Sequence, residues 1–144
     1  MHRATGSVLC TAFALTLLAG ACGRLGRTTE GLGYLTEAEQ LIETTKATWF
    51  EAEVNRIAGE IALLSPKPDA AKAETYFEHA LAIARAQQAK SWELRAAMSM
   101  ARLWRDQGKR DEARELLAPV YGWFAEGFDT RDLKEAKGLL EELA

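Results

Sequence analysis

Three copies of one short pattern occur along the chain, and this internal repetition limits the fold more than any other feature. Each copy has a small residue, a large apolar residue four positions later, and a small or apolar residue three positions after that. The copies lie in "GRTTEGLGYLTEAE", "AETYFEHALAIA" and "GKRDEARELLAPVY". Their positions are Gly31, Leu35 and Ala38, then Ala73, Phe77 and Ala80, then Ala113, Leu117 and Val120. Such repetition indicates units that bury their apolar faces against one another.

The distances between the copies agree once a single shift is allowed. Leu35 and Phe77 are 42 residues apart, whereas Phe77 and Leu117 are 40 apart. On the preceding segments, Cys10 and Trp49 are 39 residues apart, and Trp49 and Trp92 are 43 apart. A shift of three residues inside the second copy accounts for both differences, and the turn "SPKPD" is its expected place. We therefore expect the segment around Cys10 to belong to the first repeat.

Composition indicates one helical domain and excludes several classes of site. The 144 residues suffice for a single core, and 48% of them are hydrophobic. The net charge of -3 gives no field that attracts nucleic acid or an anionic membrane, so we expect neither partner. Cys10 and Cys22 are too far apart on one helix for a disulfide. With only two histidines, no metal-binding set is visible. We interpret both cysteines as small core residues.

The N-terminus supports two interpretations. Arg3 precedes an apolar run over 8–18 and the small residues of 19–21, which is the pattern of a secretory signal, and Cys22 would then be a lipidation site. The third position before this cysteine is alanine, although lipoproteins usually have a large aliphatic residue there. In the other interpretation, the run is the first helix of the first repeat and covers the apolar stripe that begins at Leu32. The register of the repeats favours the helix.

We predict an all-α fold, an antiparallel helix-pair solenoid of about three tetratricopeptide-like repeats with a C-terminal capping helix. The repeats are expected at about 6–46, 47–89 and 90–128, and the cap at 129–144. The expected helices are Gly6–Leu25, Thr28–Thr45, Thr48–Leu64, Ala70–Gln88, Ser91–Gln107, Arg110–Phe124 and Thr130–Leu143.

Local signals refine these boundaries. Asp69, Ser91, and either Asp129 or Thr130 are expected as N-caps, because their side-chain oxygens can accept from an unpaired amide. Pro119 lies inside the sixth expected helix, where it should kink or break the helix just before that position.

The repeat pattern resembles the tetratricopeptide repeat, a helix-turn-helix unit with small packing residues and a glycine in its turn. The second copy departs from it, because "SPKPD" replaces the turn glycine and either Ala58 or Gly59 is its small packing residue. The third copy matches best, at Met100, Ala101, Trp104, Gly108, Ala113 and Leu117. The first copy matches at Leu18, Ala19, Cys22, Gly26, Gly31, Leu35 and Ala38.

A second resemblance covers nearly the whole chain. "LLAGACGRLGRTTEGL", "WFEAEVNRIAGEIALL" and "LLAPVYGWFAEGFDTRDLKEAKGLLEEL" are similar to the C-terminal repeat region of large bacterial regulators. Those proteins carry an adenylate/guanylate cyclase or winged-helix domain, then a predicted ATPase, then repeats. The resemblance implies that "LLAGACG" is a helix of the repeat region. It also implies that the chain is a detached part of a multidomain signalling or transcription regulator, because neither a G-x-x-x-x-G-K-[ST] loop nor cyclase metal ligands are present.

The tetratricopeptide resemblance implies a concave face, formed by the first helix of each pair, that binds extended peptides. Arg95, Arg102 and Arg105 share one side of the fifth expected helix, and three guanidinium groups suit a carboxylate-bearing peptide. Alternatively, they form a solvated face and pair with the neighbouring acids Asp106, Asp111 and Glu112. The candidate peptide-binding residues are Phe13, Thr16, Arg24, Asn55, Arg95, Met98, Arg102 and Arg105.

These observations favour a non-enzymatic protein-interaction or regulatory module without a cofactor, because no nucleophile, base and orienting group occur together. The expected partner is a protein or peptide segment of acidic character, and the apolar first helix suggests homodimerisation. We expect a cytoplasmic protein; the alternative is an exported or lipid-anchored envelope protein with residues 1–21 as a signal. The four tryptophans, Trp49, Trp92, Trp104 and Trp123, are expected in the core.

Overall fold

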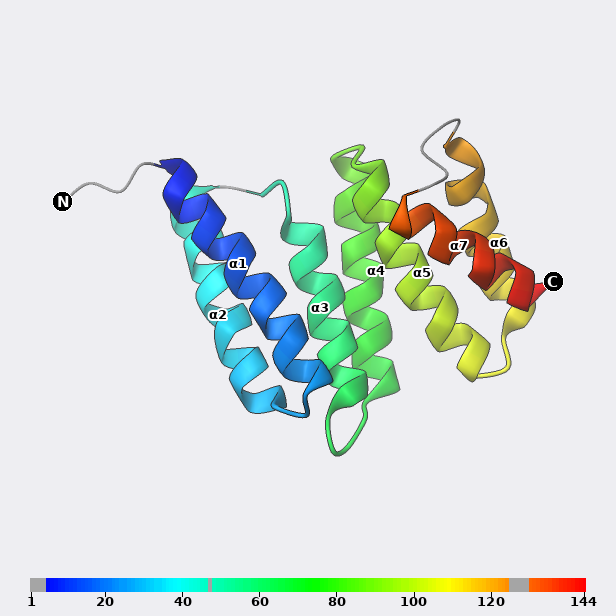
Figure 1. Cartoon of the computed structure of the whole chain (residues 1–144), viewed down its shortest axis with the longest axis horizontal. Coiled ribbons are helices and arrows are strands. Elements are labelled where there is room, and N and C mark those ends of the chain that lie inside the picture. Colours follow the sequence, from blue (N-terminus) through cyan, green and yellow to red (C-terminus); the bar gives the residue numbers. More distant parts are fainter. Residues whose placement is uncertain (1–4, 47, 125–129) are drawn as a thin grey trace.

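The computed structural model describes residues 5–46, 48–124 and 130–144, with side chains from residue 11 onward. This part of the chain forms seven helices and no strand, so the all-α prediction is confirmed (Figure 1). The largest difference from the expected starts is in the third helix, which begins three residues late. The helices are α1 (Thr5–Arg24), α2 (Thr28–Thr45), α3 (Glu51–Leu64), α4 (Ala70–Ala86), α5 (Lys90–Asp106), α6 (Arg110–Trp123) and α7 (Arg131–Leu143).

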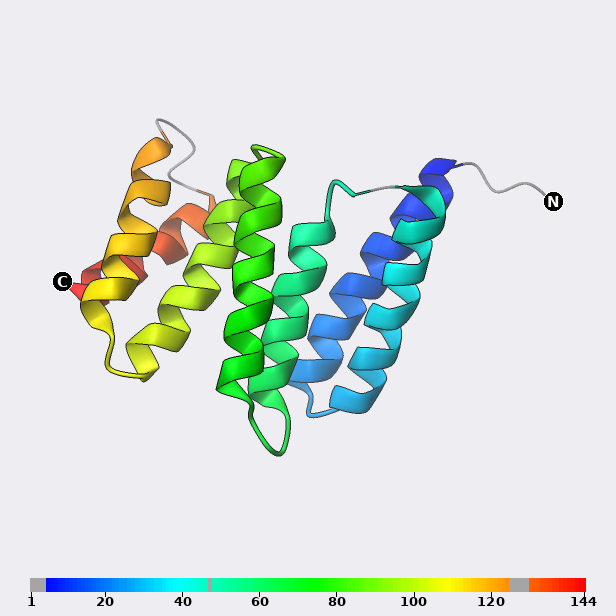
Figure 2. The same ribbon diagram turned by 180° about the vertical axis from the view of Figure 1, so that it is seen from behind.

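The first six helices form two layers, and each helix runs antiparallel to the next along the chain. Helices α1, α3 and α5 form the layer that faces the reader in Figure 1, and Figure 2 shows α2, α4 and α6 on the opposite side. The last helix, α7, crosses the first layer at its C-terminal end and packs against α5 and α6. We call the surface formed by α1, α3, α5 and α7 the inner face.

The first helix packs along α2 and also contacts α3. Its small residues make this possible, because Ala12 and Ala19 are fully buried in one core cluster with Leu35. The two backbones touch at Gly31, where an added Cβ would lie 2.9 Å from the Ala19 carbonyl oxygen. The described part of the apolar N-terminal run therefore packs against the stripe of α2, as the helical interpretation requires.

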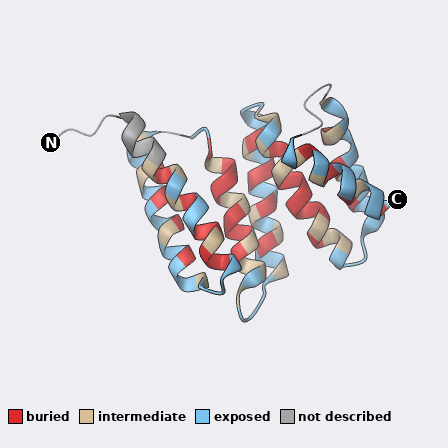
Figure 3. Ribbon diagram, viewed as in Figure 1, coloured by how far each residue is buried: buried red, intermediate tan, exposed pale blue. Residues whose placement is uncertain are grey.

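Every position of the repeated pattern is buried between the layers, where Figure 3 shows most of the buried residues. The core consists of one cluster built mainly on α1 to α3 and another built mainly on α4 to α7. Gly59 rather than Ala58 is the contact point between α3 and α4. A Cβ added at Gly59 would lie 2.5 Å from the Phe77 ring, whereas Ala58 belongs to the first cluster.

Two glycines end helices in the way the sequence indicates. Gly26 and Gly108 have φ of +80° and +81° after α1 and α5, a conformation that side chains disfavour. In both turns the amide after the glycine donates to a carbonyl five residues earlier, from Arg27 to Cys22 at 2.8 Å and from Lys109 to Trp104 at 2.7 Å. The turn after α4 has the same bond, but Gln88 occupies the left-handed position with φ 54°.

The expected N-caps are correct at two places and wrong at one. Asp69 accepts from the Lys72 amide at 3.0 Å, and Thr130 accepts from the Leu133 amide at 3.4 Å; Asp129 lies outside the described residues. The prediction for Ser91 is wrong, because α5 already begins at Lys90 and has no side-chain cap.

The kink or break expected before Pro119 is not a break, since α6 continues through this residue to Trp123. A proline removes the bond to the carbonyl four residues earlier. Here Pro119 and Glu115 are both exposed, so water can reach the freed Glu115 carbonyl.

Candidate functional site

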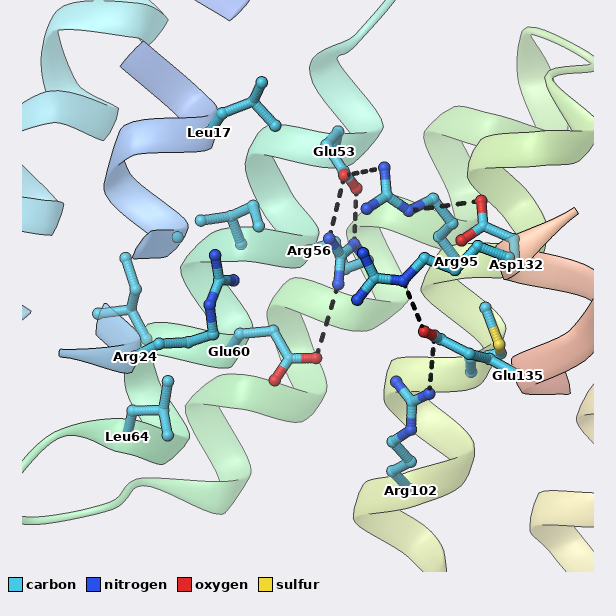
Figure 4. Close-up of a pocket in the computed structure, with 15 residues that line it drawn as sticks. Leu17, Arg24, Glu53, Arg56, Glu60, Leu64, Arg95, Arg102, Asp132 and Glu135 are labelled. Atoms are coloured by element: carbon cyan, nitrogen blue, oxygen red, sulfur yellow. Dashed lines mark hydrogen bonds and ion pairs between the residues drawn. The ribbon is translucent and has the colours of Figure 1, made fainter. Parts of the chain in front are cut away.

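A cavity of about 510 Å³ opens on the inner face, between α1, α3, α5 and α7 (Figure 4). Its apolar lining includes Leu17 of α1, Leu64 of α3 and Met98 of α5. Charged side chains dominate the rest of the wall. Five arginines and four acids line the cavity: Arg24, Arg56, Arg95, Arg102 and Arg131, and Glu53, Glu60, Asp132 and Glu135.

A buried carboxylate, that of Glu53, organises one side of this cavity. The Glu53 side chain is 1% exposed. The Arg56 guanidinium donates to both of its oxygens, at 2.6 and 3.0 Å, and Arg95 of α5 pairs with it as well. A buried charge is stable only with such partners. Arg56 and Arg95 are therefore held by Glu53 and tie α3 to α5.

Arg56 remains a cation in this buried setting. Burial alone lowers its pKa, but the hydrogen bonds and charge of Glu53, with the charge of Glu60, raise the pKa above its ordinary value. Glu60 lies 3.7 Å from the Arg56 guanidinium and accepts from the Ser99 hydroxyl at 2.7 Å. The network thus extends across the cavity from Glu53 to Glu60.

The last helix supplies a carboxylate to each of the three arginines that the sequence singled out on α5. The nitrogen–oxygen distances are 3.8 Å for Arg95 and Asp132, 3.5 Å for Arg102 and Glu135, and 2.8 Å for Arg105 and Glu142. Among the acids expected to pair with them, Asp106 contacts Arg105, whereas Asp111 pairs with Arg114. Helix α7 thus provides most of the acids that pair with these three arginines.

Glu135 is held mainly by Arg131. The hydrogen bond from Arg131 at 2.9 Å lowers the Glu135 pKa, and the charges of Arg102 and Arg131 add to this against the smaller effect of partial burial. Arg102 contacts the other Glu135 oxygen only at 3.5 Å, and its side chain is 38% exposed. Arg102 is therefore available to another carboxylate.

Arg24 is the least engaged arginine of the cavity. It makes no ion pair with any residue that the structure describes. Its guanidinium lies beside Gly20, within 3.6 Å of where a Cβ would stand, and extends over the cavity in Figure 4. Among the residues that the structure describes, five arginines but only four acids line the cavity, and Arg24 is the arginine without an acidic partner. The cavity lining therefore has a local excess of positive charge at Arg24.

Four of the eight predicted peptide-binding residues line this cavity: Arg24, Arg95, Met98 and Arg102. The other four lie outside the cavity, and the prediction of a peptide-binding residue is wrong for Thr16. Thr16 is fully buried and donates to the Ala12 carbonyl, so it faces the core. Asn55 lies in a groove between α2 and α3, and Arg105 lies outside the cavity, paired with Glu142. Phe13 belongs to a group of aromatic rings instead.

These rings, which we call the aromatic group, are Phe13, Trp49, Phe50 and Trp92. Phe13 lies 5.4 Å from Trp49, 5.7 Å from Phe50 and 6.4 Å from Trp92, measured between ring centroids. Phe50 is fully buried, but Trp49 is 47% exposed. The expectation of core tryptophans is therefore wrong for Trp49, and also for Trp123, which is 60% exposed. Trp92 and Trp104 are half-buried.

Sequence reasoning missed the acids and the apolar walls of the cavity. Glu53, Arg56 and Glu60 recur at helical spacing on α3, and this spacing was the available signal. Leu17 and Leu64 are exposed leucines that belonged to apolar runs. Their place on the inner face depends on the orientation of α1 and α3 about their own axes, and residue spacing alone does not determine this orientation.

The groove that holds Asn55 is acidic on one side. Glu39, Glu43 and Glu51 line it together with Ile42 and Val54. Burial, and then the charge of Glu51, raise the pKa of Glu39 above its ordinary value. The Asn55 amide is already used, because it donates to the Glu51 carbonyl at 3.1 Å.

Leu18 of α1 and Leu25, which follows the end of α1, are exposed, and Leu18 belongs to the apolar run that would form the expected homodimer contact. Cys22 is a buried free thiol, as expected of a core residue; the side chain of Cys10 lies outside the described residues.

Neither a metal cluster nor a membrane-spanning helix is found in the part of the chain that the structure describes. No three His, Cys, Asp or Glu side chains gather there as ligands, and no helix is both long and apolar enough to cross a membrane. No family model, curated protein or solved structure matches the chain. The inner face is therefore the basis for assigning a function.

Proposed function

We propose that the chain is a non-enzymatic protein-interaction module, a tetratricopeptide-like solenoid whose inner face binds an acidic, extended segment of another protein. Three features support the solenoid: the antiparallel helix pairs, the buried repeat positions and the glycine turns after α1 and α5. The sequence resemblance favours a place in a multidomain signalling or transcription regulator. There, the upstream ATPase or a separate partner would supply the segment.

The observation that carries this proposal is the pair of accessible guanidinium groups, Arg24 and Arg102, in one cavity. Arg24 has no carboxylate partner among the described residues, and Arg102 has one long contact. Arginine binds carboxylates through two parallel hydrogen bonds, which a peptide acid would complete here. Leu17, Leu64 and Met98 provide apolar surface for the neighbouring ligand residues.

The fixed network limits which residues can take part. Arg56 and Arg95 are used by Glu53, and freeing them would leave a buried carboxylate without partners. That loss costs about 3–5 kcal/mol, more than a partly exposed ion pair with a ligand returns. The ligand therefore meets Arg24 and Arg102 while Glu53, Arg56 and Arg95 remain paired.

A charge-reversal pair tests the proposal. The probe is a short fluorescein-labelled peptide of alternating Asp, Ser and Leu residues, and its binding is followed by fluorescence anisotropy. We expect Arg24→Glu to weaken binding by about tenfold or more, on the scale of one charge-assisted contact. Arg27→Glu is the matched control, because Arg27 lies one turn away and outside the cavity, 67% exposed and 3.8 Å from Glu30.

We expect the control to bind as the wild type does, and added salt to weaken wild-type binding. Absence of peptide binding, or an equal loss in both variants, would overturn the proposed site. Circular dichroism of both variants verifies that they fold alike.

A further inference from the structure

The aromatic group continues the inner face by one helical turn beyond the cavity. Its members Phe13, Phe50 and Trp92 each lie three or four positions before a cavity residue on the same or adjoining segment, namely Leu17, Glu53 and Arg95. The N-terminal ends of α3 and α5 lie at the same end of the layer in Figure 1. The inner face thus has an aromatic end and, where Arg24 and Leu64 lie, a basic end.

Trp49 is the accessible ring at the aromatic end. It lies 6.4 Å from Trp92 and 4.8 Å from Phe50, and nearly half of its side chain is exposed. The Gln87 side-chain amide donates to the Thr48 carbonyl at 2.8 Å and so ties the backbone before Trp49 to the end of α4. A held, exposed indole beside a half-buried one can stack with a ligand side chain without much loss of entropy.

The charges nearby select the class of that side chain. The Arg95 guanidinium lies 5.7 Å from the Trp92 ring centroid and already occupies the cation site of that ring. A cationic ligand residue would meet Arg95 there, as well as the excess positive charge of the cavity lining. An aromatic side chain has no such repulsion and matches the rings in shape.

The two ends also set a spacing. Phe13 and Arg24 are eleven residues apart on α1, a rise of about 16 Å. An extended peptide covers about 3.3 Å per residue, so about five residues join the two ends.

We propose that the ligand of the inner face is an extended peptide in which an aromatic residue lies about five positions from a carboxylate. The aromatic residue stacks on Trp49 and Trp92, and the carboxylate binds Arg24 and Arg102. This inference rests on the proposed function and specifies its ligand.

Labelled peptides of equal length test the spacing on the unaltered protein, and the first two sets described below also have identical composition. One set carries Phe and Asp five positions apart, in either order, within a Gly-Ser chain; a second carries them side by side; a third has Ser in place of Phe. We expect the tighter of the two five-position peptides to bind about tenfold more strongly than the others, on the scale of one aromatic contact. Equal affinity for all of them would overturn the ligand assignment.

Substitution of the indole tests the platform. Trp49→Ala should reduce the affinity for the five-position peptide to that for the peptide without Phe. Trp49→Phe should retain most of the affinity that the Phe residue adds. Trp123→Ala is the matched control, since Trp123 is an exposed tryptophan on α6 outside the cavity. If Arg24→Glu weakens binding but Trp49→Ala does not, the aromatic end is wrong and the proposed function stands. If no acidic peptide binds at all, both fail.

Discussion

Replacing Gly59 with alanine tests the packing of α3 against α4, because two effects of opposite sign compete there. In a helix interior, alanine is favoured over glycine by about 1 kcal/mol. Against this, the new Cβ would lie 2.5, 2.8 and 3.0 Å from three atoms of the Phe77 ring, where carbon atoms normally lie about 3.5–4 Å apart. Phe77 is fully buried and cannot move aside. Overpacking of this kind costs about 3 kcal/mol, so the substitution should be destabilising overall.

We expect Gly59→Ala to lower the free energy of unfolding by about 2 kcal/mol and the Tm by about 4–8 °C, measured by calorimetry. Gly138→Ala is the matched control, because Gly138 lies on α7 with open space around its Cβ position. That variant should be more stable than wild type by about 1 kcal/mol. Phe77→Leu should lower the free energy of unfolding by less in the Gly59→Ala variant than in the wild type, because the smaller side chain relieves the overlap. Equal stabilisation by both alanines would refute the close contact.

Three further predictions concern a turn, a carboxylate and the cavity network. Gln88→Gly should stabilise the chain by about 1 kcal/mol in chemical denaturation, because Gln88 holds a left-handed conformation, whereas Gln87→Gly should not stabilise it. Glu39→Gln should raise the Tm at pH 7: the raised Glu39 pKa means that its ionisation opposes folding as pH rises through that pKa. The gain should disappear as pH falls below the ordinary carboxylate range. Arg56→Met should lower unfolding free energy by about 3 kcal/mol, since Glu53 loses its two-point partner, and Arg24→Met should leave it unchanged; equal effects would contradict the network.

The helices and the core could be predicted because both depend on local spacing. The pattern at Leu35, Phe77 and Leu117 repeats with a helical period, and each of these side chains is buried. Gly26 and Gly108 marked their turns for the same local reason. Gln88 adopts the same conformation without a glycine, so its turn left no signal in the sequence.

The site was less predictable because it depends on helix rotation and on partners far along the chain. Arg24 and Arg102 were placed on the inner face by the repeat pattern, but the same pattern placed Thr16 there, although Thr16 is fully buried. Glu135 and Glu142, which pair with Arg102 and Arg105, come from α7, more than thirty residues away. Trp49 was expected in the core from helical spacing, yet it precedes the start of α3, where helical spacing does not apply.

Amide chemical-shift mapping with the acidic peptide tests the proposed binding face most directly. We predict that the shifts concentrate on Leu17, Gly20, Arg24, Met98 and Arg102, all from the helices of the inner face, and that they saturate with the affinity found by anisotropy. Shifts confined to α2, α4 and α6, or none at saturating peptide, would contradict binding at the inner face.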